Sequence, residues 1–200
     1  MKKFFVLAAM AAFALVSCDN GDIDLGKDEE GEKNVTPLVL NELDGQAKFI
    51  ELYNNTNAAI TLTEYTLVKY DSKKEGGKST TWTGAEGMTI AAKGFVVLES
   101  SDLEDPEEGG VVGYPYESRN HIFKGGLSPK KNVKIELVNP EGIVVDTFVR
   151  GEEGSAGWNQ GKLSEVEEHS FSRCPNGTGD FARAVPTKGA VNGEKVADLD

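Results

Sequence analysis

The stretch LVLNELDGQAKFIELYN, residues 38–54, holds the pattern that decides the fold. Two runs rich in Val, Ile, Leu, Phe and Tyr flank the pair Asp44-Gly45, and such residues are enriched in β-strands. Asp and Gly both tolerate a positive φ, so this pair between two strand-like runs predicts a β-hairpin. We therefore expect antiparallel strands over 38–43 and 48–54, joined by a turn at Asp44-Gly45.

Beyond this hairpin the chain continues as short apolar runs bounded by turn residues, without a helical period. Further strands are expected at 60–70, 79–83, 88–91, 95–99, 121–124, 133–138, 143–149, 170–173 and 181–184. Such a series of short strands with frequent turns is typical of an all-β immunoglobulin-like β-sandwich. We expect this domain to cover residues 35–194, with 195–200 as a C-terminal tail.

The first 17 residues are a separate segment with the layout of a secretory signal. Lys2 and Lys3 precede an unbroken apolar run over 4–16, too short to span a bilayer as a permanent helix. The following Ser17-Cys18 resembles the lipobox of bacterial lipoproteins. The resemblance implies cleavage before Cys18 and lipid attachment to its thiol, so the partner expected for this end is a membrane. A plain cleaved signal peptide, with Cys18 incidental, is the alternative.

Residues 18–34 are strongly acidic and poor in large apolar side chains. Seven acidic residues face two lysines in this stretch, so it cannot fold alone and charge repulsion extends it. We interpret it as a flexible tether. An acidic stretch after a lipidated cysteine resembles the surface-export signal of some Gram-negative lipoproteins, which predicts an outer-membrane, cell-surface location. Asp19 beside Cys18 is the competing signal, for retention at the inner membrane.

The charge balance excludes one class of partner. The chain has 21 basic and 33 acidic residues, a formal net charge of −12. Loss of Lys2 and Lys3 with the leader leaves 19 basic residues against 33 acidic ones, a charge of −14. A phosphate backbone binds cationic surfaces, so we expect no nucleic-acid partner. Cys174 is the one cysteine besides Cys18, so no disulfide is expected within the lipidated chain.

A series of short strand motifs follows in a fixed order from about Val39 to Asn192. Their residues are Asn41, Glu42, Ile50, Glu51, Leu52, Asn54, Asp146, Arg173, Gly189 and Asn192. In this order they resemble the lamin tail domain. The resemblance implies an immunoglobulin-like sandwich that serves in bacteria as a module of secreted and surface proteins, with no agreed catalytic residues. The chain departs from the family's closing Pro-Gly, which is Lys188-Gly189 here, and has a longer segment at 101–120.

Candidate chemistry is sparse. Glu42 and Glu51 flank the hairpin turn and are candidates for paired acid/base carboxylates. The alternative is that both occupy strand positions, hydrogen-bonded to the backbone or solvated. Cys174 is a candidate nucleophile or, alternatively, a small buried apolar residue. His121, His169 and Cys174 lack metal-ligand spacing, so we expect no catalytic residue and no cofactor.

Two groups of loop residues are candidate ligand contacts. Oxygen ligands at high density can hold calcium, and the weak candidates, with a solvated charge run as the alternative, are Asp102, Glu104 and Asp105. Exposed aromatic rings can stack on sugars or fill a protein pocket. The candidate aromatics, with capping of the sandwich ends as the alternative, are Trp82, Tyr114, Tyr116 and Trp158.

These observations favour a membrane-anchored surface lipoprotein with a non-catalytic domain that binds an unidentified protein or carbohydrate, in an adhesion role. The alternative is a hydrolase, or an accessory module of a secreted hydrolase system. A hydrolase needs a concave pocket in which polar groups converge. A nucleic-acid module, suggested by fold analogy alone, is opposed by the charge of the chain.

Overall fold

The structure is a computed structural model that describes residues 35–70, 77–103, 121–129, 131–151 and 168–199. Within these ranges the regular elements are thirteen strands in three sheets, without a helix. No helix in the described ranges is therefore long and apolar enough to cross a membrane. The leader, Cys18 and the acidic tether lie outside them. Residues 34–200 form one compact unit, which contains all of the strands.

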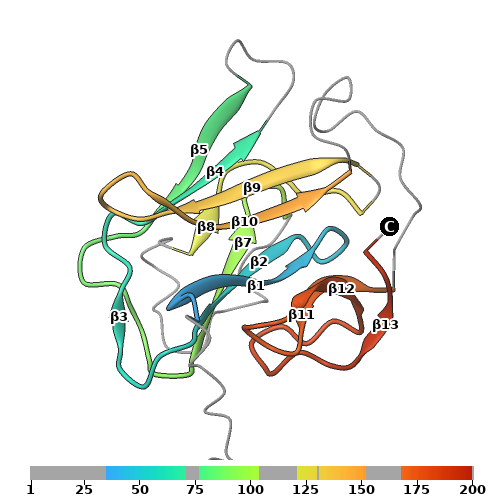
Figure 1. The fold of residues 1–200 in the computed structure, drawn as a ribbon. Coiled ribbons are helices and arrows are strands. Elements are labelled where there is room, and N and C mark those ends of the chain that lie inside the picture. Colours follow the sequence, from blue (N-terminus) through green and yellow to red (C-terminus); the bar gives the residue numbers. More distant parts are fainter. Residues whose placement is uncertain (1–34, 71–76, 104–120, 130, 152–167, 200) are drawn as a thin grey trace, which may run out of the picture. The chain divides into compact units, whose positions relative to one another are not determined.

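The larger sheet has seven strands and contains both the first and the last strand of the domain (Figure 1). In spatial order they are β13 (Lys195–Ala197), β12 (Asp180–Ala184), β11 (Ser170–Cys174), β1 (Leu38–Asp44), β2 (Phe49–Asn54), β7 (Phe95–Ser100) and β8 (Ile122–Phe123). All neighbours are antiparallel except β7 and β8. The first strand therefore lies in the middle of the sheet, between its own hairpin partner β2 and the late strand β11.

A second sheet of four strands faces the first across the core, and a two-stranded sheet lies beside them (Figure 1). The four strands are β10 (Val144–Arg150), β9 (Val133–Val138), β4 (Thr66–Tyr70) and β5 (Lys78–Thr83). The pair is β3 (Ile60–Thr61) and β6 (Thr89–Ile90).

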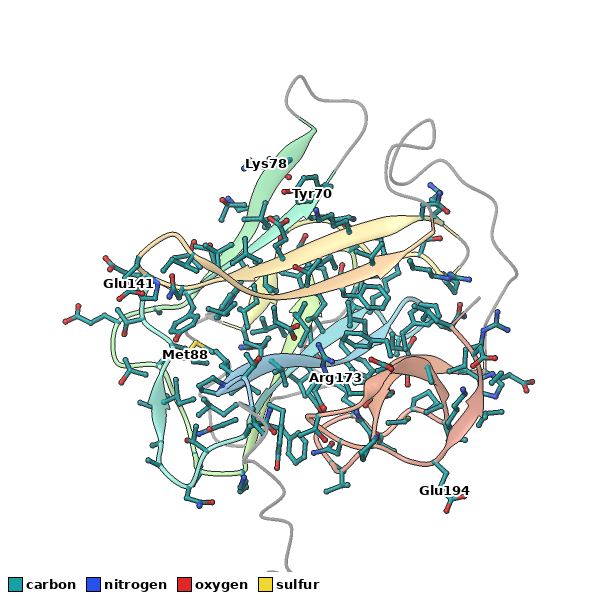
Figure 2. All side chains as sticks on the ribbon, viewed as in Figure 1. Tyr70, Lys78, Met88, Glu141, Arg173 and Glu194 are labelled. Atoms are coloured by element: carbon teal, nitrogen blue, oxygen red, sulfur yellow. The ribbon has the colours of Figure 1, made fainter. Side chains whose placement is uncertain are left out.

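Apolar side chains from both sheets fill the space between them (Figure 2). Leu40, Leu52 and Leu98 from the larger sheet and Leu137 and Phe148 from the smaller one are each 0% exposed. Burial of one such side chain stabilises the fold by about 1.5–3 kcal/mol. The expected immunoglobulin-like β-sandwich is thereby confirmed.

The single strand expected over 60–70 is divided in two. Glu64 takes a positive φ of 63°, and the N–H of Tyr65 donates to the carbonyl of Leu62, 3.0 Å away. This turn separates β3 from β4 and sends them to different sheets. Leu62, at the break, is 0% exposed, so the turn places an apolar side chain in the core instead of continuing the strand.

The domain also extends beyond the expected boundary at residue 194. Lys195–Ala197 forms β13, which pairs with β12 through Arg183–Ala197 and Ala184–Lys195. The segment expected as a C-terminal tail is therefore in part an edge strand. Its three residues are too few to show a period of two, which is why the pattern of the sequence did not indicate a strand.

The first hairpin is confirmed, but its turn differs from the expected one. The positive φ falls at Lys48, at 57°, and not at Asp44 or Gly45. The Asp44 carboxylate instead accepts the N–H groups of Gln46 and Ala47, both at 2.7 Å. Gly45 is needed for space, because a Cβ there would lie 2.4 Å from the backbone nitrogen of Pro129.

Candidate functional site

A β-bulge in β1 sets up the polar cluster that contains most of the motif residues. The register with β2 shifts between Leu40 and Glu42, which leaves Asn41 as the extra residue. A bulge re-aims the side chains beside it. Asn41 and Glu42 both lie on the outer face, the face of the larger sheet turned away from the core, while Leu40 and Leu43 fill the core. Two adjacent polar side chains therefore share one face.

Glu42 and Glu51 lie directly opposite each other on β1 and β2, and both are 0% exposed. Glu42 accepts the N–H of Thr187 at 2.9 Å and its hydroxyl at 3.0 Å, one on each carboxylate oxygen. Glu51 accepts the side-chain N–H of Asn41 and the backbone N–H of Gly189, both at 2.7 Å. The C-terminal loop, residues 185–194 between β12 and β13, therefore crosses the outer face on these two carboxylates.

Burial raises the pKa of both carboxyl groups. Desolvation raises the pKa of Glu51 to about 8, against the opposing hydrogen bonds from Asn41 and Gly189, and the charge of Glu42 adds to the rise. Desolvation also raises the pKa of Glu42, against hydrogen bonds from Ser170 and Thr187. Two like charges in register on paired strands repel each other. Burial and mutual repulsion therefore both favour a protonated form of the pair.

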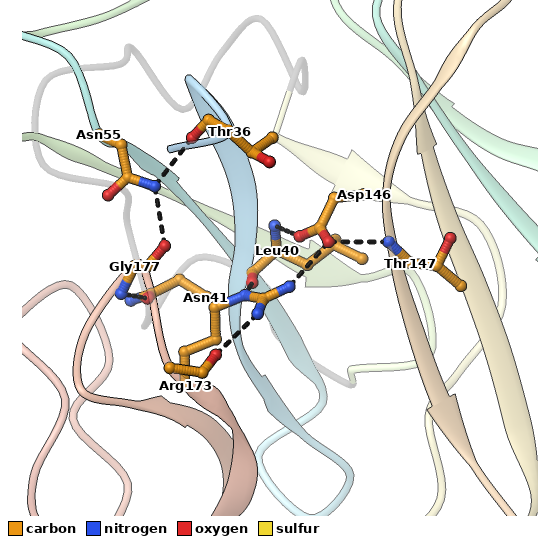
Figure 3. A network of polar contacts seen from close by, with 9 residues as sticks. Thr36, Leu40, Asn41, Asn55, Asp146, Thr147, Arg173 and Gly177 are labelled. Carbon is orange, nitrogen blue, oxygen red and sulfur yellow. Dashed lines mark hydrogen bonds and ion pairs between the residues drawn. The ribbon is translucent and has the colours of Figure 1, made fainter. Parts of the chain in front are cut away.

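Three asparagines connect β1 to the C-terminal loop and to the turn after β11. The side-chain N–H₂ of Asn41 lies 3.1 Å from Asn176 Oδ1 and 3.3 Å from Asn192 Oδ1. Asn192 in turn donates to the carbonyls of Asn41 and Arg173, both at 3.0 Å. Asn41 Oδ1 accepts the N–H of Gly177 at 2.9 Å, a contact visible in Figure 3. The three asparagines thus link the backbones of β1 and β11 to the C-terminal loop and to the turn after β11.

An ion pair ties the two sheets together beside this cluster (Figure 3). The guanidinium of Arg173, on β11, contacts Asp146 Oδ1 of β10 at 2.7 Å and donates to the carbonyl of Leu40 at 2.8 Å. Asp146 also accepts the N–H of Leu40 at 2.8 Å. The Arg173 guanidinium lies over the ring of Phe181, 4.4 Å from its centroid. The pair thus satisfies both backbone groups of Leu40 next to the bulge.

A third carboxylate on the outer face holds the lysine of the C-terminal loop. Glu99, on β7, is 1% exposed, and its Oε1 lies 2.5 Å from the Nζ of Lys188. The Lys188 ammonium also lies over the ring of Phe49, 5.7 Å from the centroid. The second oxygen, Glu99 Oε2, is buried without a hydrogen-bond partner in the structure as described. Lys188 therefore provides the charge compensation for this buried carboxylate.

The structure brings together seven of the ten motif residues singled out from the sequence. They are Asn41, Glu42, Glu51, Asp146, Arg173, Gly189 and Asn192. Ile50 and Leu52 fill the core, and Asn54 holds a neighbouring loop through the carbonyls of Ala58 and Ala91. The interpretation of Glu42 and Glu51 as hydrogen-bonded strand residues fits this geometry.

Sequence reasoning missed the partners that complete the cluster. They are Thr187, Lys188, Asn176, Glu99 and Ser170. Thr187 lies 145 positions from Glu42, and Lys188 lies 89 positions from Glu99. No spacing rule within one element relates residues so far apart. The only signal for these partners was the presence of acidic residues within apolar strands. A carboxylate that is buried there needs hydrogen-bond donors from elsewhere in the chain.

The aromatic candidates fare differently. Trp82 lies on β5 with 4% of its surface exposed, as part of the core, so its assignment as a ligand contact is wrong. The ring packs beside Gly84, where an added Cβ would lie 3.2 Å from it. Tyr114, Tyr116 and Trp158 lie outside the described residues, and their contact with a ligand stays a prediction.

The remaining candidates show no assembled site. Asp102 is exposed in a turn after β7, while Glu104 and Asp105 lie outside the described residues. Within the described ranges no three His, Cys, Asp or Glu side chains are placed to hold a metal ion. Cys174 is half-buried, and burial raises the pKa of its thiol, which reduces the thiolate needed by a nucleophile.

Comparison with known proteins identifies the family of the chain. The family model described as Lamin Tail Domain matches residues 32–152. This range runs from before β1 to just after β10, so it leaves out β11, β12, β13 and the C-terminal loop. No curated protein sequence matches the chain.

Proposed function

The chain belongs to the lamin tail domain family, and from this premise we propose that it is a non-catalytic binding module on the surface of a bacterial cell. A lipid on Cys18 holds it in the outer membrane, and the acidic tether of residues 18–34 spaces the domain from the bilayer. The module binds a protein or a carbohydrate, in an adhesion role. It uses no cofactor and binds no nucleic acid.

The observation that carries the non-catalytic assignment is the environment of Glu42 and Glu51. A general acid or base must come within hydrogen-bond reach of the proton that it transfers. Both carboxyl groups are 0% exposed, and their oxygens are occupied by Thr187, Asn41 and Gly189. This favours a structural role for the pair and argues against the hydrolase alternative.

The support for the anchor comes from the leader. Lys2 and Lys3, the apolar run over 4–16 and Ser17-Cys18 occur in the order of a lipoprotein signal. Each buried methylene of an attached acyl chain contributes about 0.8 kcal/mol, so two or more chains give stable anchoring. The acidic residues that follow favour export to the surface.

Replacement of the lipidated cysteine tests the anchor. We expect Cys18→Ala to move the protein from the membrane fraction to the soluble fraction, because no acyl chain can be attached. Cys174→Ala, the matched control, should stay with the membranes and be accessible to protease on intact cells. A Cys18→Ala protein that fractionates like the wild type would contradict lipid anchoring.

A binding screen with the domain beginning at Cys18 tests the module. The domain is incubated with a glycan array and with solubilised cell-surface proteins, and Tyr116→Ala and Trp158→Ala variants are compared with it. We expect a ligand whose retention falls in at least one aromatic variant. Hydrolysis of a retained glycan or protein, lost in Glu51→Gln, would instead support the hydrolase alternative.

A further inference from the structure

The C-terminal loop, residues 185–194, is held on the outer face almost entirely by polar contacts. Thr187, Lys188 and Gly189 reach three carboxylates, one on each of β1, β7 and β2. The valines of the loop contribute little, since Val185 is 58% exposed and Val191 is 66% exposed. Its attachment therefore depends on the state of the carboxyl groups beneath it rather than on apolar burial.

The charged groups around the pair come from every neighbouring element. Asp44 lies on β1, and its negative charge acts on Glu42. Cys174 faces Glu42 from β11, with its thiol neutral because burial raises the pKa. Lys188, from the loop itself, is paired with Glu99 of β7. No described cation contacts Glu42 or Glu51 directly, so a second negative charge on the pair has no local counter-ion.

We propose that the C-terminal loop is a latch, and that its closed position depends on one proton kept by the Glu42–Glu51 pair. With the proton present, the pair carries one negative charge and accepts the N–H groups of Thr187 and Gly189. Without it, two buried charges face each other across paired strands. Water reaches them only when the loop lifts, so loss of the proton favours the open position. The latch thus adds a pH-dependent opening of the outer face to the binding function.

The direction of the pH effect follows from linkage. In the open position Glu51 is solvated and returns to its ordinary pKa of 4.5, while in the closed position burial raises the pKa to about 8. The closed loop therefore binds the proton more tightly than the open one. Opening becomes more favourable as the pH rises from about 4.5 to about 8, by up to about tenfold per pH unit, and levels off above that range.

Hydrogen exchange on the detergent-solubilised full chain tests the latch. Exchange is followed by mass spectrometry from pH 5 to pH 9 and corrected for the intrinsic pH dependence of amide exchange. We expect the peptide over 185–194 to exchange through its own opening, with lower protection than the peptide over 49–54. Its protection should fall by up to about tenfold per pH unit up to about pH 8 and then remain constant.

Two variants test whether Glu51 causes the pH dependence of the loop's protection. Glu51→Gln keeps an oxygen for the Gly189 N–H but cannot titrate, so the pH dependence of its protection over 185–194 should be much weaker than in the wild type. Glu141→Gln, the matched control, changes an exposed acid in the turn between β9 and β10 and should behave like the wild type. The proposal is overturned if the wild-type loop shows pH-independent protection, or if it opens only together with the peptide over 49–54.

A second measurement serves if Glu51→Gln does not fold. Carbon-13 NMR of the wild-type side-chain carboxyls reports the titration of Glu51, and amide signals report Thr187 and Gly189. We expect the two amide signals to change over the same pH range as the Glu51 carboxyl. A carboxyl that titrates while both amides stay unchanged would overturn the latch, as would a Glu51 that titrates near its ordinary pKa.

Discussion

At the scale of single residues, three acidic side chains are buried on the outer face of the larger sheet. Their burial is tolerated because each carboxyl group has donors. Glu42 and Glu51 accept hydrogen bonds from the C-terminal loop, and Glu99 is paired with Lys188. Burial of a charge without such partners costs several kcal/mol. The acids therefore hold residues 187–189 against the outer face.

The raised pKa of Glu51 predicts the pH dependence of stability. A carboxyl group whose pKa is about 8 in the folded state and 4.5 in the unfolded state keeps its proton more tightly when folded. Its stabilising effect is complete below about pH 4.5 and is lost as the pH rises to 8. We expect the free energy of unfolding to fall in this range by up to about 1.4 kcal/mol per pH unit. Urea titrations from pH 5 to pH 8 measure the slope, which Glu51→Gln should reduce.

Arg173→Ala tests the ion pair between the sheets. The change removes the contact with Asp146, the donor to Leu40 and the stacking on Phe181. We expect a loss of about 2–4 kcal/mol in the free energy of unfolding, because Asp146, whose side chain is only 12% exposed, is left without its cation. Lys195→Ala, which removes an exposed pair with Asp198, is the control and should leave the urea midpoint unchanged. An Arg173→Ala protein with the wild-type midpoint would contradict this role.

At the scale of elements, local patterns predicted most strands, while the connections depended on contacts that are distant in sequence. The strand over 133–138 and the Asn139–Gly142 turn appear as expected, because both signals are local. The break at Glu64 and the turn at Lys48 were not predictable from the sequence. Both residues take a positive φ, a conformation that Glu and Lys usually avoid. They arise where the core and a packed neighbour determine the path of the backbone.

Gly45 and Gly142 give a matched test of this distinction. Gly45 has no positive φ, but a Cβ there would lie 2.4 Å from Pro129 and 2.6 Å from Ser128. We expect Gly45→Ala to destabilise the domain by about 1–3 kcal/mol through overpacking. Gly142 has a φ of 79° with open space around it, so Gly142→Asn should cost less than about 1 kcal/mol. Equal thermal midpoints for the two variants would show that the close approach at Gly45 is relieved without cost.

At the scale of the whole domain, the family match and the fold do not end together. The match stops at residue 152, whereas β11, the neighbour of central β1, begins at Ser170. The motif residues before and after that point meet in one cluster, as the contacts of Asn41 with Asn192 show. The sequence indicated the strands and these motif residues. It could not indicate that Thr187 meets Glu42, because nothing in either segment alone specifies the other.

The most direct test of the central claim, that these carboxylates make the C-terminal loop part of the domain, is the urea unfolding of shortened chains at pH 6. A chain that ends at Ala184 lacks the loop and β13, while a chain that ends at Leu199 keeps both, together with the contact of Leu199 with the core, and serves as the control. We predict that the first loses roughly 3–5 kcal/mol of unfolding free energy, because the hydrogen bonds of Glu42 and Glu51, the ion pair of Glu99 and the pairing of β13 are lost, and that the second matches the full chain. Equal midpoints for the chain ending at Ala184 and the full chain would contradict the account.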